Sequence, residues 1–210
     1  MKNKILTLVA VALFSYSSTQ AQHFDINLNV LNFAFSKYEL GAEYGFNDKV
    51  AVGLNINTAS KNMTEAGGEK YSEFNVIPTF KYFSNPEKGD DGFYLGAFAR
   101  YRSSASNDNK FLTLDNNSIP VIEKTDVKSS AIGLGALTGY KWVASNGFIV
   151  EAEIGVGKLL SNSITISNSK ADDETKNLTT DWDEKDYLPI LGNKIPVDLR
   201  LALKIGYRIK

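Results

Sequence analysis

The chain has 210 residues and no cysteine, which excludes disulfide frameworks, thiolate metal sites and cysteine nucleophiles. The first 21 residues contain two lysines and no acid, so the remainder carries 21 basic and 24 acidic groups, a net charge of 21 − 24 = −3 with histidine neutral. Without a basic excess, we do not expect nucleic-acid binding. The 16 glycines and 24 aromatic residues (10 Tyr, 12 Phe and 2 Trp) favour β structure.

The N-terminal segment has the pattern of a secretory signal peptide. Lys2 and Lys4 precede the apolar run Ile5 to Phe14, and small and polar residues follow up to Ala21. A membrane anchor is the alternative, but this run falls short of the roughly 20 residues that span a bilayer. We therefore predict a signal peptide over 1–21 and one domain over 22–210. No later apolar run is long enough to span a membrane, so any membrane insertion would use strands.

Apolar residues then alternate with polar or small ones with a period of two, which indicates strands. The pattern is clearest at the C-terminal end, where all seven odd positions from Val197 to Ile209 are apolar and the even ones are charged or small. The same alternation predicts eight strands in all, near 24–31, 37–46, 50–57, 73–82, 93–102, 131–142, 148–157 and 197–210. The upper boundary of the first strand, around 32–36, is the least defined.

The connections between these strands alternate in length. Those at 47–48, 84–92 and 144–147 are short and turn-like, whereas those at 59–70, 103–128 and 160–196 are long and polar. In an up-and-down meander all the short turns lie at one end. Outer-membrane barrels have this asymmetry, with short periplasmic turns and long extracellular loops.

Alternation alone leaves two interpretations, a soluble periplasmic barrel with an apolar interior or an inverted barrel in a membrane. Ten glycines lie on the charged face, where the narrow interior of an eight-stranded barrel needs small side chains. The apolar face repeats bulky residues without taper. Aromatic residues gather at strand ends as in an interfacial girdle, with Tyr38, Phe74 and Tyr101 near the long loops and a larger group near the short turns: Tyr44, Phe46, Phe80, Tyr82, Phe93, Tyr140, Trp142, Phe148 and Tyr207. We therefore predict an all-β, eight-stranded antiparallel up-and-down transmembrane β-barrel.

In strand number, girdles and loop asymmetry the chain resembles the small eight-stranded outer-membrane β-barrel proteins, the OmpA/OmpX-like group. The resemblance implies a place in the outer membrane of a Gram-negative cell after signal-peptide cleavage. It also implies contact with outer-membrane lipid and lipopolysaccharide and with the outer-membrane assembly machinery. Such barrels usually end in an aromatic residue, whereas Tyr207 is followed here by Arg208, Ile209 and Lys210. No peptidoglycan-binding domain is expected after the barrel.

The inward face carries six acids and eight bases, which we expect to pair because unpaired charges away from bulk water are costly. An ion-conducting pore is one interpretation, and a salt-bridge network that plugs the barrel is the other. Eight strands enclose too little space for an obvious pore, which favours the plug. The predicted lumen network comprises Glu39, Glu43, Glu73, Lys81, Arg100, Lys141, Glu151, Glu153, Asp198, Arg200 and Lys204, with Lys37, Arg102 and Arg208 on the same face.

Other motifs give weaker signals. Gly155 to Lys158 lacks the leading glycine and the final Ser or Thr of a P-loop. His23, the single histidine, is expected at the short-turn end with no serine or carboxylate obviously beside it. Asp181, Asp183 and Asp186 could offer oxygens to calcium, but a solvated acidic loop is the simpler interpretation. Trp182 in that loop is a candidate contact residue.

The sequence therefore predicts a non-enzymatic barrel without a cofactor. It would present long extracellular loops for envelope-structural, adhesion or binding roles toward an unknown extracellular ligand. A narrow channel for ions or small solutes is the first alternative. A lipid-modifying outer-membrane enzyme is the second, and it is disfavoured because the one histidine lies far from the outer rim.

Overall fold

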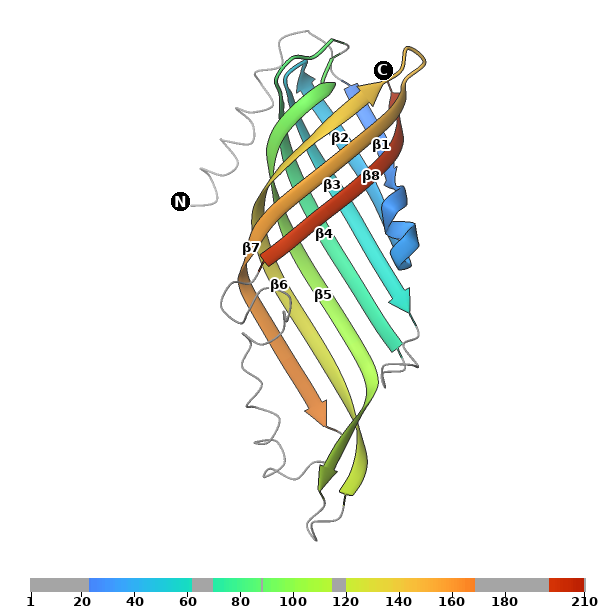
Figure 1. Ribbon diagram of the computed structural model, residues 1–210, viewed down its shortest axis with the longest axis vertical. Coiled ribbons are helices and arrows are strands. Elements are labelled where there is room, and N and C mark those ends of the chain that lie inside the picture. Colours follow the sequence, from blue (N-terminus) through green and yellow to red (C-terminus); the bar gives the residue numbers. More distant parts are fainter. Residues whose placement is uncertain (1–22, 62–69, 88, 115–119, 169–196, 210) are drawn as a thin grey trace, which may run out of the picture.

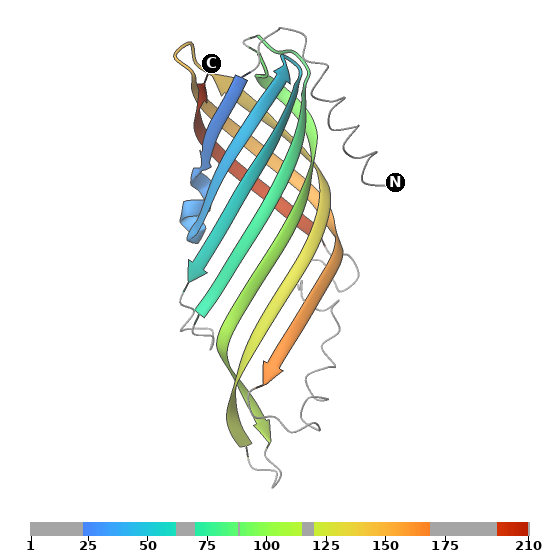
Figure 2. The same ribbon diagram turned by 180° about the vertical axis from the view of Figure 1, so that it is seen from behind.

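The protein is a closed barrel of eight antiparallel strands that are paired in chain order (Figures 1 and 2). The computed structural model describes residues 23–61, 70–87, 89–114, 120–168 and 197–209. The elements are β1 (His23–Asn29), η1 (Val30–Phe35), β2 (Lys37–Asn47), β3 (Val50–Lys61), β4 (Lys70–Phe83), β5 (Gly92–Leu114), β6 (Pro120–Val143), β7 (Phe148–Asn168) and β8 (Val197–Ile209). The predicted all-β up-and-down barrel is confirmed.

The C-terminal strand closes the barrel by pairing with the first. Ile26 lies opposite Tyr207, and Leu28 lies opposite Ile205, so apolar residues of both strands share the outer face. A slip of one residue would turn every charged residue of β8 outward. The strict alternation of β8 therefore fixes the register of the closure.

The three short turns lie together at one end of the barrel, as predicted, and β8 also ends there (Figure 1). In the β2–β3 turn, the Asn47 side chain accepts the backbone N–H groups of Lys49 and Val50, each at 2.9 Å. Gly147 in the β6–β7 turn has φ of +89°, a conformation that favours glycine. We call this the turn end and the opposite one the loop end.

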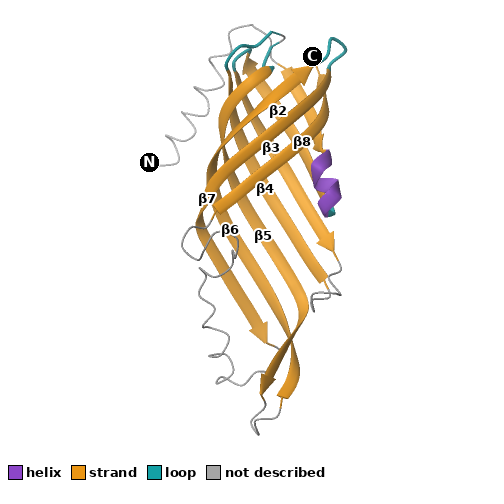
Figure 3. Cartoon of the chain, viewed as in Figure 1, coloured by secondary structure: helices purple, strands orange, loops and turns teal. Residues whose placement is uncertain are grey.

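The predicted long connections are shorter than expected, and this is a correction. Most of 103–128 is not a loop, because β5 continues to Leu114 and pairs along β6, which begins at Pro120. The two strands run past the rest of the barrel as a hairpin (Figure 3). β7 likewise extends to Asn168. Outside a membrane neither face of a strand must be apolar, so the period-two signal disappears although the backbone pairing continues.

The connection between β1 and β2 also differs from the expected extended strand. β1 ends at Asn29, two residues before the predicted end, and the 3-10 helix η1 follows (Figure 3). Asn29 Oδ1 accepts the backbone N–H of Leu203 on β8 at 3.2 Å. Ser36 has φ of +56° and reverses the chain into β2. Phe33 and Tyr38, with ring centroids 5.7 Å apart, pack across this reversal.

The barrel is inverted relative to a soluble protein, with charges inside and bulky apolar residues outside. Leu199 is 65% exposed and Leu134 is 54% exposed, whereas Lys81 is fully buried. Soluble proteins almost never bury lysine or glutamate unless they are paired, and they seldom expose a continuous apolar surface. This polarity is that of a transmembrane barrel. Within the described residues, no helix has the length and apolar character needed to cross a bilayer.

The structure places the predicted girdle residues on the outer face near the turn end. Seven are substantially exposed, namely Phe80, Tyr82, Phe93, Tyr140, Trp142, Phe148 and Tyr207. Tyr44 and Phe46 are partly covered because their rings pack edge to face, with centroids 5.0 Å apart. Their role as a membrane-interface girdle stays a prediction.

Candidate functional site

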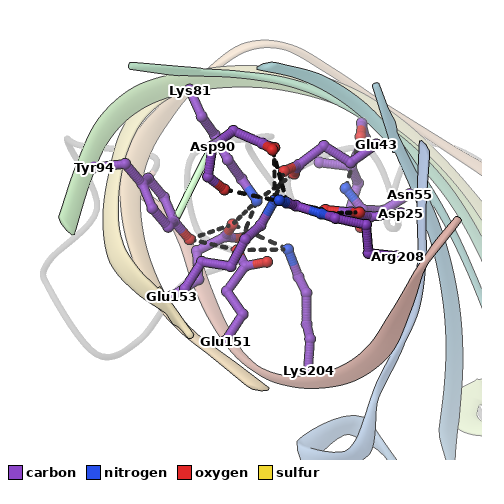
Figure 4. A network of polar contacts seen from close by, with 12 residues as sticks. Asp25, Glu43, Asn55, Lys81, Asp90, Tyr94, Glu151, Glu153, Lys204 and Arg208 are labelled. Atoms are coloured by element: carbon purple, nitrogen blue, oxygen red, sulfur yellow. Dashed lines mark hydrogen bonds and ion pairs between the residues drawn. The ribbon is translucent and has the colours of Figure 1, made fainter. Parts of the chain in front are cut away.

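The candidate site is the charged interior of the barrel. Its side chains come from strands far apart in the sequence, because alternate residues of every strand point to the same face. Figure 4 shows these groups converging from opposite walls toward the middle of the barrel. They form two groups along the barrel, one deep and near the turn end, the other toward the loop end.

The deep group, which we call the inner cluster, consists of residues that are almost completely buried. Its cations are Lys81, Lys141, Arg200, Lys204 and Arg208, and its carboxylates are Asp25, Glu39, Glu43, Asp90, Glu151 and Glu153.

Lys141 and Arg208 organise the end of the inner cluster nearest the turns. Lys141 Nζ lies 2.9 Å from Asp25 Oδ2 and 2.9 Å from Asp90 Oδ2, and it also bonds Glu43. Arg208 donates to both oxygens of Asp25, at 2.8 and 2.9 Å, and to Asp90 Oδ1 at 2.7 Å. Two cations thus hold three carboxylates in one compact cage.

Glu43 links this cage to the next layer, because one of its oxygens bonds Lys141 and the other bonds Lys81. Lys81 Nζ is also 2.6 Å from Glu151 Oε1. The Tyr94 hydroxyl donates to the same Glu151 oxygen at 2.5 Å.

The layer closest to the loop end completes the inner cluster. Lys204 Nζ lies 3.0 Å from Glu153 Oε2, and Arg200 bonds Glu153 and also Glu39 Oε1, the latter at 2.8 Å. Glu39 accepts further bonds from Asn32 at 2.8 Å and from Asn57 at 3.3 Å. Every charge of the inner cluster therefore has an opposite partner.

Aromatic and aliphatic side chains from one wall fill the rest of this part of the lumen. Ala51, Ile77, Phe83, Tyr94, Phe98 and Leu137 form a buried apolar cluster. Glycines opposite the rings make room for them: a Cβ at Gly135 would lie 2.5 Å from Phe98 Cε1, and one at Gly139 would lie 2.5 Å from the Tyr94 hydroxyl. This explains why the sequence places glycine on the charged face.

Asp90 is the one inner-cluster residue that comes from a connection, the β4–β5 turn. Burial raises the pKa of its carboxyl to about 6, against the opposing effect of the neighbouring Lys141 and Arg208 charges. The inner cluster has six carboxylates and five cations, so one protonated carboxyl would balance its charge. Asp90 therefore holds a proton more readily than an exposed aspartate.

The second group, which we call the outer cluster, lies toward the loop end and is more accessible. It consists of Lys37, Tyr71, Glu73, Arg100, Arg102 and Asp198. Glu73 accepts from Lys37 at 2.9 Å, from the Tyr71 hydroxyl at 2.5 Å and from Asn75 at 2.7 Å. Arg100 Nη1 lies 2.8 Å from Asp198 Oδ1.

The structure places all eleven residues of the predicted lumen network inside the barrel, distributed over these two clusters. Sequence reasoning missed Asp25 and Asp90, and with them the predicted six acids become 6 + 2 = 8, which equals the eight bases. Asp25 could have been found from its alternation with Phe24 and Ile26. Asp90 could not, because it lies in a turn, where no alternation indicates the direction of a side chain.

The expectation for His23 is wrong, and those for Trp182 and the acidic loop fall on residues that the structure does not describe. His23 does have a carboxylate beside it, since its Nε2 is 3.5 Å from Asp90 Oδ1; the turn that carries Asp90 folds into the barrel mouth. Trp182, Asp181, Asp183 and Asp186 lie outside the described residues, as does the segment 1–21 that is predicted to be a signal peptide. One carboxylate oxygen of each of Asp25, Glu43 and Asp90 lies within 4.8 Å of the others, close enough to hold a metal ion. Lys141 and Arg208, however, already bond to oxygens of this cluster.

Comparisons with known proteins place the chain in a family. Residues 5–187 match the family described as "Protein of unknown function (DUF3575)", and the chain belongs to it. No curated protein matches the sequence.

Among solved structures, the chain is similar to a major outer membrane protein from Thermus thermophilus, with 13% identity over 90% of this chain and 100% of that one and a TM-score of 0.49. It is also similar to CarO from Acinetobacter baumannii, with 14% identity, coverage of 89% and 96%, and a TM-score of 0.43. CarO2 of the same species has 13% identity, coverage of 90% and 98%, and a TM-score of 0.44.

Proposed function

We propose that the protein is an outer-membrane β-barrel whose lumen is plugged and whose β5–β6 hairpin and loops serve envelope-structural, adhesion or binding roles. Its outer face supports the membrane assignment: bulky apolar residues cover the strands, and aromatic residues gather near the turn end. Its partners in this setting are outer-membrane lipid and lipopolysaccharide, the outer-membrane assembly machinery and an extracellular ligand.

The observation that carries the proposal is the inner cluster. Ions crossing the barrel would have to displace side chains that are paired across the whole lumen, such as Lys81 with Glu43 and Glu151. Breaking a buried pair by removing one partner typically costs about 3–5 kcal/mol, and a permeating ion would have to disturb several pairs. This favours the plug over the channel.

The β5–β6 hairpin is the part best suited to contacts outside the membrane. β4 begins at Lys70, which pairs with Asn107 of β5. β5 continues beyond Asn107 to Leu114, without β4 beside it. Pairing in this hairpin continues to Leu114 opposite Pro120, so the hairpin is regular secondary structure and not an irregular loop. Long surface connections on a rigid scaffold commonly carry binding functions.

The proposal is non-enzymatic. His23 lies at the turn end, where its Nε2 faces Asp90. Arg208 and Lys141 are the nearby positive charges. Both Lys141 and Arg208 are engaged by carboxylates, and this arrangement offers no nucleophile.

The test combines conductance and binding. The refolded protein in planar bilayers should give no channel steps. A variant in which Ala105 is joined to Lys128 by Asn-Gly, which shortens the hairpin at a paired position, should still show heat-modifiable migration on gels. It should lose adhesion of protein-bearing cells to surfaces that the full chain binds. Steady conductance of the native protein, with unchanged adhesion of the shortened variant, would replace the proposal with the channel alternative.

A further inference from the structure

The outer cluster holds more positive than negative charge. It contains three cations, Lys37, Arg100 and Arg102, and two carboxylates, Glu73 and Asp198. Glu73 is fully engaged by Lys37, Tyr71 and Asn75. One carboxylate, Asp198, therefore remains for two arginines.

Asp198 forms an ion pair with Arg100 but not with Arg102 among the described residues. Its Oδ1 pairs with Arg100 Nη1 at 2.8 Å, while its Oδ2 packs against the bare backbone of Gly133, where a Cβ would lie 2.6 Å away. The glycine lets the carboxylate turn toward β6. In this position Oδ2 has no hydrogen-bond partner in the described chain, so it makes no hydrogen bond to Arg102.

Arg102 has no ion-pair or hydrogen-bond partner among the described residues, and its Nε is buried. Arg100 Nε is buried and unpartnered as well. The two residues are two positions apart on β5, so both point inward and their Cα atoms are about 7 Å apart. Two guanidinium groups this close repel each other unless an anion lies between them.

The neighbouring residues hold the arginines in place and close the lumen beneath them. Arg100 lies over the Phe98 ring, 5.8 Å from its centroid, and its Nη2 donates to the Leu199 carbonyl at 3.4 Å. The inner cluster blocks the lumen on the turn side. The group is partly open to solvent, since the Arg100 side chain is 17% exposed and that of Lys37 is 33% exposed.

We propose that Arg100 and Arg102 form an anion-binding site that takes a small oxyanion, a phosphate or carboxylate group, entering from the loop end. Guanidinium groups present forked N–H donors that match the oxygens of such groups. Because the inner cluster closes the lumen below, the site binds its anion without passing it through the barrel.

The probe is inorganic phosphate, measured by equilibrium dialysis at low ionic strength against the folded full chain in micelles of a zwitterionic detergent. We expect one saturable site. Arg102→Gln and Arg100→Gln should each weaken binding at least about tenfold, the loss of one charge-assisted bidentate contact. Lys49→Gln removes the same charge from the exposed β2–β3 turn and should leave binding unchanged.

Heat-modifiable migration checks that each variant is folded. Arg102→Lys keeps the positive charge but removes the paired N–H donors of the guanidinium group, so it should weaken phosphate binding by a smaller factor than Arg102→Gln. Absence of saturable binding by the native chain would overturn the proposal, as would equal binding by the native, Arg102→Gln and Lys49→Gln proteins. The proposal would also fail if phosphate bound only after the acids of 172–186 were replaced by their amides, because the chain's own carboxylates would then be the anion.

Discussion

The inner and outer clusters share one barrel and the same residue types, yet they differ in how completely their charges are paired. In the inner cluster, six strands and one turn contribute eleven charged groups, all with opposite partners and nearly all sealed from solvent. In the outer cluster, Arg102 has no partner within the described chain. Ion pairing closes the narrow lumen where every charged group has an opposite partner, as in the inner cluster. The outer cluster has three cations and two carboxylates, and its surplus positive charge lies toward the loop end.

The largest expected effect is loss of an inner-cluster cation. Lys141→Met leaves Asp25, Glu43 and Asp90 with too few positive partners, so the free energy of unfolding should fall by about 3–5 kcal/mol. Arg102→Met in the outer cluster removes no pair and should change it by less than about 1 kcal/mol. Urea unfolding in lipid vesicles measures both. Equal losses would show that the two clusters do not differ in pairing.

The comparison also requires that the faces are assigned correctly, which β8 tests. Leu203 is outward and 42% exposed, whereas its neighbour Lys204 is 1% exposed. Leu203→Arg should lower the free energy of unfolding by roughly 2–4 kcal/mol, the value for a lipid-facing arginine near the bilayer midplane. Leu203→Ala should have a mild effect because no packed core is lost. A larger loss of unfolding free energy for Leu203→Ala than for Leu203→Arg would contradict the inverted barrel.

Two tyrosines provide a matched pair of smaller changes. Tyr94→Phe removes a fully buried hydroxyl donor to Glu151 and should cost about 1.5–3 kcal/mol, as expected for a hydrogen bond to a charged group. Tyr71→Phe removes the equivalent donor to Glu73 in the more accessible outer cluster, where water can replace it, and should cost less. The same unfolding assay would distinguish them, and a larger loss for Tyr71→Phe would reverse the proposed order of burial.

The smallest effect concerns pH and Asp90. Its pKa is raised from 3.8 to about 6, so between those values the folded protein binds more protons than the unfolded chain. The stabilisation by this group is complete below about pH 4 and is lost as the pH rises through 6. Asp90→Asn cannot ionise, so its unfolding free energy should rise relative to that of the native protein between pH 4 and pH 7. Parallel pH profiles of the two proteins would show that Asp90 does not titrate in this range.

The sequence by itself determined the eight strands, their order and the two faces of each, because the side-chain period of a strand is local. The alternation of β8 places Leu203 and Lys204 on opposite faces, and the glycines of the charged face and the aromatic residues at strand ends indicate that Lys204 is the inward one. The short turns were predictable for the same reason, since Asn47 and Gly147 carry their own turn geometry. The extension of β5 and β6 was missed because strands outside a membrane need no apolar face.

Only the tertiary structure decided which charges meet. Lys141 and Asp25 are 116 positions apart in the chain, and Arg208 and Asp25 are 183 apart, so their contact depends on the closure of the barrel and the stagger of its strands. Asp90 enters the lumen because a turn folds into the barrel mouth, which no alternation records. The same stagger brings Asp198 Oδ2 against Gly133, where it has no hydrogen-bond partner within the described residues. Pairing over such distances is set by three-dimensional register, whereas the sequence pattern sets only the direction in which each side chain points.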